Sequence, residues 1–169
     1  DPAMWALASG DDGTVALGEN ELSIAIQSGK SYIYSLRKEP ILDNFYLEIS
    51  AGPTLCNGQD EYGVLLRASG NRDGYRFGLS CDGQTRLDRI RGFEASNLRP
   101  WSVSGAFPPG APSLTKIGVW ASGDELRFFI NDDYQFTFRD PQISSGQIGV
   151  YARSSGAGSL TVLFSGLVV

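Results

Sequence analysis

The residues of this chain that could recognise a ligand are aromatic and charged side chains on predicted strands. In the predicted strand 45–50, successive side chains alternate between the two faces, so Leu47 and Ile49 point inward while Tyr46 and Glu48 point outward. The same alternation in the predicted strands 62–68, 75–81 and 116–120 points one further polar or aromatic side chain of each strand outward. An aromatic ring can stack on the apolar face of a pyranose, while guanidinium and carboxylate groups bond its hydroxyls. We therefore predict a sugar-binding sheet face that carries Tyr46, Glu48, Arg67, Arg76 and Trp120. The alternative is an ordinary exposed face with a cross-strand pair between Glu48 and Arg67.

The composition excludes most catalytic chemistries. The chain contains no histidine, which removes the usual general base, the Ser-His and Cys-His pairs and most zinc sites. We expect a non-catalytic protein. An enzyme would depend on carboxylates, and Glu48 would then need a second carboxylate about 5 to 9.5 Å away across a cleft.

Acidic pairs in predicted turns allow two interpretations. Asp favours turn conformations, so these pairs can be ordinary solvated turns. A Ca2+ site built from oxygen ligands is the other interpretation. Its predicted ligands are Asp60, Glu61, Asp132 and Asp133.

The two cysteines flank one half of a predicted hairpin. Segments 62–68 and 75–81 are strand-like, and the Gly- and Asn-containing segment between them is typical of a turn. With a turn near Asn71 and Arg72, Tyr62 lies opposite Cys81, and Cys56 can fold back onto Cys81. We predict a Cys56–Cys81 disulfide, worth roughly 3 kcal/mol in the chain-entropy model, and an oxidising compartment. Two unpaired thiols are the alternative.

Length and charge favour one acidic domain without nucleic-acid binding. The 169 residues are enough for one core, and 14 basic residues stand against 19 acidic ones, with a net charge of −5. The basic residues are scattered, whereas phosphate-backbone binding needs a basic patch. We expect a single domain over 1–169, with 1–13 as a linker or edge segment. We also expect no membrane span or leader in this chain, although an anchor or fused domain could have been removed.

Short alternating segments separated by turn residues predict an all-β fold of two packed antiparallel sheets. The predicted strands are 14–17, 21–26, 32–36, 45–50, 62–68, 75–81, 85–90, 116–120, 125–130, 134–138, 147–152 and 160–164. Four prolines between Arg91 and Ser113 make that segment a poor central strand, and we expect it to cross an edge of the sandwich. Trp5 and Trp101 are expected to cover the core or an edge.

Several segments together resemble one family of domains. They are Tyr62-Gly-Val-Leu-Leu-Arg67, Tyr75-Arg-Phe-Gly-Leu79, Glu125-Leu-Arg-Phe-Phe-Ile-Asn131, Gly146-Gln-Ile-Gly-Val-Tyr-Ala152 and Phe164-Ser-Gly-Leu-Val168. Their order resembles a concanavalin A-like jelly-roll β-sandwich, in particular the bacterial laminin-G-like group with the 3-keto-disaccharide hydrolase-type domains. The chain departs from that pattern at Asp132, where the family has Gly, and after Phe164, where it has Asp-Asn.

The resemblance implies an extracytoplasmic module that binds carbohydrate or another cell-envelope ligand. The fold carries lectins, glucanases and adhesive modules alike. Jelly-roll glucanases place Glu-x-Asp-x-x-Glu on one strand, and this chain has no such motif. A protein-interaction or adhesion module is the first alternative, and a glycoside hydrolase-like enzyme is the second.

Overall fold

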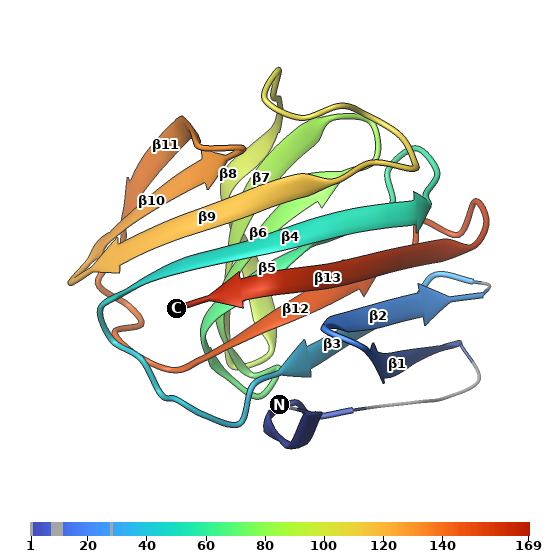
Figure 1. The fold of residues 1–169 in the computed structure, drawn as a ribbon. Coiled ribbons are helices and arrows are strands. Elements are labelled where there is room, and N and C mark those ends of the chain that lie inside the picture. The colour runs from blue at the N-terminus through green and yellow to red at the C-terminus, as the bar shows by residue number, and fades with distance from the viewer. Residues whose placement is uncertain (1, 8–11, 28) are drawn as a thin grey trace.

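A computed structural model describes residues 2–7, 12–27 and 29–169. Its strands form two antiparallel sheets, of which the sheet with β9, β4 and β13 lies in front in Figure 1. The seven-stranded sheet has the order β1 (Gly13–Gly18), β2 (Glu21–Ile26), β13 (Leu160–Val168), β4 (Phe45–Leu55), β9 (Thr115–Ser122), β10 (Glu125–Ile130) and β11 (Asp133–Arg139). The six-stranded sheet has the order β3 (Tyr32–Leu36), β12 (Gln147–Arg153), β5 (Glu61–Ser69), β6 (Asp73–Ser80), β7 (Gln84–Arg91) and β8 (Glu94–Val103).

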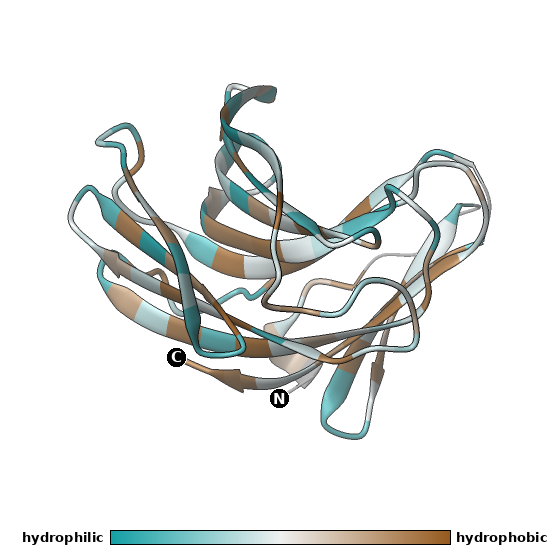
Figure 2. Ribbon diagram, turned by 90° about the horizontal axis from the view of Figure 1, so that it is seen from above, coloured by the Kyte–Doolittle hydropathy of each residue, from teal (hydrophilic) through white to brown (hydrophobic). Residues whose placement is uncertain are grey.

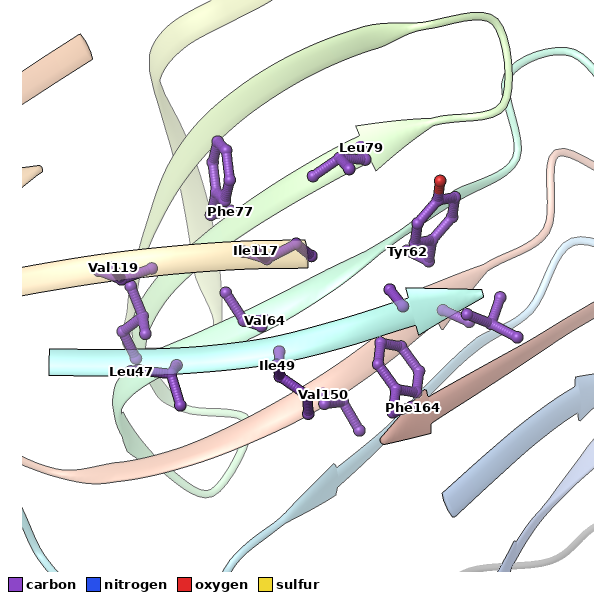
Figure 3. Packing of buried hydrophobic residues seen from close by; sticks show 14 of the residues in the cluster. Leu47, Ile49, Tyr62, Val64, Phe77, Leu79, Ile117, Val119, Val150 and Phe164 are labelled. Carbon is purple, nitrogen blue, oxygen red and sulfur yellow. The ribbon is translucent and has the colours of Figure 1, made fainter. Parts of the chain in front are cut away.

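The core lies between the two sheets because each strand turns every second side chain inward. Figure 2 shows the resulting alternation of hydrophobic and hydrophilic segments along the strands. Leu47 and Ile49 of β4 are buried as predicted, and Ile117 of the neighbouring strand β9 is buried with them. They pack with Val64 and Phe77 of the other sheet, and Figure 3 shows these side chains between the two layers.

The hairpin of β5 and β6 forms as predicted, but its register differs by two residues. Tyr62 pairs with Leu79 rather than with Cys81. At the turn Ser69 pairs with Asp73, one residue from the predicted register, and a bulge between Leu66 and Ser69 adds the second residue. After the bulge, Ala68 packs with Tyr151 on the outer face of the sheet.

Cys56 and Cys81 form the predicted disulfide, with their Cα atoms 5.9 Å apart. The backbone N–H of Cys81 donates to the carbonyl of Asp60 at 2.9 Å, so the strand pairing continues up to the bridge. Local pairing therefore places Cys81 beside the loop that carries Cys56.

Strand β8 was missed in the sequence because of its proline. It forms the edge of the six-stranded sheet and, among the described strands, pairs with β7 alone. Pro100 is tolerated there because an edge strand has one side free of ladder hydrogen bonds. The segment is therefore not a central strand, as expected, but residues 94–103 form an edge strand that was not predicted.

The described part of the N-terminal segment lies along β3. A 3-10 turn at Pro2–Met4 precedes Trp5, which bridges to Arg37, and Ala6 donates to the carbonyl of Leu36. Residues 1 and 8–11 of the predicted linker or edge segment lie outside the described residues. Within the described residues, no helix is long and apolar enough to cross a membrane.

Arg67 was predicted to point outward, and this prediction is wrong. It sits in the β5 bulge with φ of 48° and only 1% of its surface is exposed. Its guanidinium donates to the carbonyls of Asp43 at 2.7 Å, Gly123 at 2.8 Å and Ile143 at 3.1 Å. Burial lowers its pKa. Arg67 therefore joins three separate loops from inside the structure.

Replacing Arg67 with Met should lower the free energy of unfolding by about 3 to 5 kcal/mol, because it leaves buried carbonyls without donors. The control is Arg72→Met, since Arg72 is exposed and lies 3.9 Å from its acidic neighbour Asp73. Urea unfolding measures both. Equal small losses would contradict the structural role of Arg67.

Alkaline pH should destabilise the fold through its buried tyrosines. Burial raises the pKa of Tyr62 and of Tyr75 to about 12, from an ordinary value of 10.0. The unfolded chain therefore loses these protons first, and stability that is complete below pH 10 declines between about pH 10 and 12, by about 1.36 kcal/mol per unit for each group. In urea unfolding from pH 8 to 11, Tyr62→Phe should show a shallower decline than the parent. An unchanged slope would refute the assignment.

Candidate functional site

The five predicted ligand-binding residues do not share one face. Tyr46, Glu48 and Trp120 lie on the outer face of the seven-stranded sheet, on neighbouring strands β4 and β9. Arg67 and Arg76 belong to the six-stranded sheet. The expected common surface is therefore wrong, because alternation fixes the side of a strand but not the sheet to which the strand belongs.

Tyr46, Glu48 and Trp120 form a small cluster of their own. Tyr46 is directly opposite Trp120, and its hydroxyl donates to Glu48 Oε1 at 2.6 Å. Burial, followed by the bond to Glu48, raises the pKa of Tyr46 to about 12. The guanidinium of Arg127 lies 4.5 Å from the Trp120 ring centroid. One face of the indole is therefore already occupied by a cation.

The outer face of the six-stranded sheet carries a buried charged network centred on Glu61. Glu61 Oε1 accepts from Arg86 Nη2 at 2.6 Å and from Arg153 Nη1 at 3.2 Å. Its other oxygen, Oε2, accepts from the Tyr151 hydroxyl at 2.8 Å. The three donors come from β7 and β12, and the carboxylate comes from β5. One carboxylate thus ties three strands together.

A second ion pair continues this network across the sheet. Arg76 Nη2 on β6 lies 2.9 Å from Asp88 Oδ2 on β7, and both side chains are nearly fully buried. The Arg76 guanidinium also lies 5.4 Å from the Tyr32 ring centroid and 5.7 Å from that of Tyr151. Such cation–π contacts are stronger where water is excluded.

The electrostatics of the outer face keep its tyrosines protonated and its arginine charged. Burial raises the pKa of Tyr151, with the charge of Glu61 adding to it, and burial also raises the pKa of Tyr32. Burial by itself would lower the pKa of Arg76, but Tyr151 and Asp88 outweigh it and the pKa is raised. The Tyr151 hydroxyl thus stays protonated beside the Glu61 carboxylate, to which it donates.

A glycine makes room for this arrangement. Gly78 of β6 lies opposite Arg86 and next to Glu61 and Tyr151. A Cβ atom on Gly78 would overlap the Tyr151 hydroxyl and lie 2.9 Å from Glu61 Oε2. The sheet surface is flat at this point, so the carboxylate and the phenol can meet above it.

A pocket of about 420 Å³ opens beside the charged network. Its walls include Tyr32 from β3 and Trp101 from the edge strand β8, with the Arg86 guanidinium 4.7 Å from the Trp101 ring centroid. Aromatic walls around convergent polar groups are typical of small-molecule sites, which occupy about 300 to 1,000 Å³. The lining comprises Lys30, Ser31, Tyr32, Gln59, Glu61, Arg86, Trp101, Arg153, Ser154 and Ser155.

The four predicted Ca2+ ligands lie in two places. Asp60 is fully buried, and its oxygens accept from Asn57 and Ser155, while Glu61 belongs to the network above. Asp132 and Asp133 lie at the β10–β11 hairpin, where Asp132 pairs with Lys116 at 2.7 Å. The structure therefore does not bring the four carboxylates together.

Within the described residues, one cluster has the spacing of metal ligands. It consists of Cys56, Asp60 and Cys81, whose ligand atoms lie within 4.8 Å of one another. Both sulfurs are joined in the disulfide, so the cluster offers no thiolate.

The sequence analysis did not place Arg86, Arg153 and Trp101 in this network and pocket. Arg86 and Asp88 flank the inward-facing Leu87, and Arg153 follows the inward-facing Ala152. Strand alternation alone could therefore have placed the side chains of Arg86, Asp88 and Arg153 on the outer face. Trp101 was expected to cover an edge. It lies on the edge strand β8, where it also forms a wall of the pocket.

Glu61→Gln should destabilise the protein by about 3 to 5 kcal/mol, because it removes one partner from a buried, paired set of charges. Glu48→Gln is the matched control and should cost less than about 1 kcal/mol, since Glu48 is more exposed and makes a surface hydrogen bond. Thermal melts of both variants test the difference. A Glu61 variant as stable as the Glu48 variant would contradict the central role of Glu61.

No family model matches the chain, and no curated protein matches its sequence. Solved structures do match its fold. The carbohydrate-binding module CBM66 from Bacillus subtilis has a TM-score of 0.73 at 14% identity, covering 97% of this chain and 93% of the other. A β-glucanase of Bacillus licheniformis has a TM-score of 0.74 at 10% identity, covering 99% and 92%.

A sialidase structure matches over part of its length. The TM-score is 0.69 at 10% identity, and the match covers 99% of this chain but 17% of the sialidase chain. These identities establish the fold alone. The two-sheet architecture and its structural neighbours show that this protein has the concanavalin A-like jelly-roll β-sandwich fold.

Proposed function

We propose that this protein is a non-catalytic, extracytoplasmic module that binds carbohydrate in the pocket on the outer face of the six-stranded sheet. The observation that carries this proposal is the convergence of Tyr32 and Trp101 with Glu61, Arg86 and Arg153 around one pocket. Aromatic rings suit the apolar face of a sugar, and the charged groups suit its hydroxyls. Structural neighbours that include a carbohydrate-binding module and a glucanase support the same class of ligand.

The existing partners of three carboxylates support the non-catalytic part of the proposal. The Glu61 oxygens are already engaged by Tyr151 and two arginines, and Asp88 is paired with Arg76. A general acid or base must instead be free to exchange a proton with the substrate. Glu48 accepts from Tyr46 and lies on the opposite sheet.

The disulfide supports an oxidising, extracytoplasmic location.

A protein-interaction module is the second candidate, because the seven-stranded sheet exposes aromatic rings. Tyr46 is 41% exposed and Tyr134 is 57% exposed on its outer surface. An interface there would show as self-association or partner binding that is lost in Tyr134→Ser. The two candidates use opposite faces of the sandwich and can be separated by single variants.

Trp101→Ala should weaken glycan binding by roughly 1 to 3 kcal/mol, the range for a ring that stacks on a planar ligand. The ligand is first identified on a glycan array, with and without Ca2+, and its affinity is measured by calorimetry. Trp120→Ala on the opposite face is the matched control and should bind like the parent. Loss of binding in the Trp120 variant alone would refute the pocket and restore the seven-stranded face as the site.

A further inference from the structure

We propose that the pocket selects a sugar that carries a carboxylate, a hexuronate residue, and this inference rests on the proposed carbohydrate-binding function. The side chains that line the pocket include three cations, Lys30, Arg86 and Arg153, but one carboxylate, Glu61. The chain as a whole is acidic, with a net charge of −5. The pocket is therefore a local positive site on a negative protein, and such a site attracts anions.

The excess positive charge remains when the groups behind the lining are included. Arg76 adds one cation, and the buried carboxylates of Asp88 and Asp60 add two anions. Four cations then stand against three carboxylates. The oxygens of Asp60 accept hydrogen bonds from Asn57 and Ser155 rather than from an arginine. The surroundings thus do not neutralise the pocket.

The hydrogen bonds show which arginine charges are only partly compensated by carboxylates. One oxygen of Glu61 serves both Arg86 and Arg153, and its other oxygen serves Tyr151. The Nε of Arg86 is buried without a hydrogen-bond partner, although Asp88 Oδ2 lies 3.5 Å away. A single carboxylate shared by two guanidinium groups leaves one positive charge without a full partner.

Arg153 is the group placed to receive a second carboxylate. It is the most exposed arginine of the network, with 38% of its side chain accessible, and its guanidinium lies 5.1 Å from the Tyr32 ring centroid. The ring and the bond to Glu61 hold the guanidinium in place, so its remaining N–H donors are ordered before the ligand arrives. Lys30 adds a second cation at the same pocket. A hexuronate would set its carboxylate on Arg153 and its ring against the aromatic wall.

The test compares oligouronates with the same oligosaccharides after methyl esterification, which removes the charge and keeps the sugar ring. Calorimetry with glucuronate-, galacturonate- and mannuronate-containing oligomers should give binding to at least one acid form. Its methyl ester should bind at least about tenfold more weakly, because charge-assisted hydrogen bonds are roughly twice as strong as neutral ones. Binding of the acid form should also weaken when the salt concentration rises.

Arg153→Gln should produce a loss similar to esterification. Lys30→Gln, at an exposed position, gives a second variant that preserves the network and should produce a smaller loss. Arg139→Gln is the control, because Arg139 is an exposed arginine on β11, at the edge of the other sheet. Thermal melts confirm that each variant is folded.

Each outcome decides between the two proposals. Equal binding of acid and ester, or binding of neutral glycans alone, overturns the acidic-sugar inference but leaves the carbohydrate-binding function if Trp101→Ala weakens that binding as predicted above. Binding of the acid form that is unchanged in Arg153→Gln, Lys30→Gln and Trp101→Ala overturns the inference, because the ligand then lies elsewhere. Absence of binding to any glycan overturns both proposals.

Discussion

The carboxylate of Glu61 is the group on which the arrangement of the outer six-stranded face depends. It accepts from Arg86, Arg153 and Tyr151 and so fixes side chains from β7 and β12 above β5. Arg86 in turn lies against Trp101, and Arg153 against Tyr32. Both aromatic walls of the pocket are therefore positioned through one buried anion. Without it, two guanidinium groups would repel each other in a partly dehydrated site.

A buried ionic network of this kind stabilises a sheet inefficiently, because the desolvation of its charges offsets much of their attraction. Apolar residues of similar volume often stabilise a protein as well as a buried ion pair does, or better. The inner faces follow that rule, since Leu47, Val64 and Phe77 form an apolar core. The outer face instead keeps Glu61, Arg76 and Asp88 buried and charged. This contrast between the two faces of one sheet supports a role in recognition for the outer face.

The fold could be predicted from the sequence because it rests on local patterns. Alternation identified the inward side chains of β4 and β9, and turn residues located the β5–β6 hairpin and its neighbouring disulfide. The bulge that buries Arg67 and shifts the register has no comparable local signal, because its positive φ is occupied by an arginine rather than a glycine. The prediction of one common binding face was wrong for a different reason. Whether Tyr46 and Arg76 share a sheet depends on long-range strand order, which alternation does not encode.

The three tryptophans allow a direct test of where the ligand binds. Trp101 lines the pocket beside Glu61, Trp120 lies on the outer face of the seven-stranded sheet, and Trp5 lines a separate cleft beside Arg37. Each indole N–H gives its own nuclear magnetic resonance signal, so one titration of the labelled protein with the bound glycan reports on all three places. The account predicts that the Trp101 signal shifts while those of Trp5 and Trp120 stay fixed. A shift of Trp120 or Trp5 with an unchanged Trp101 signal would contradict it.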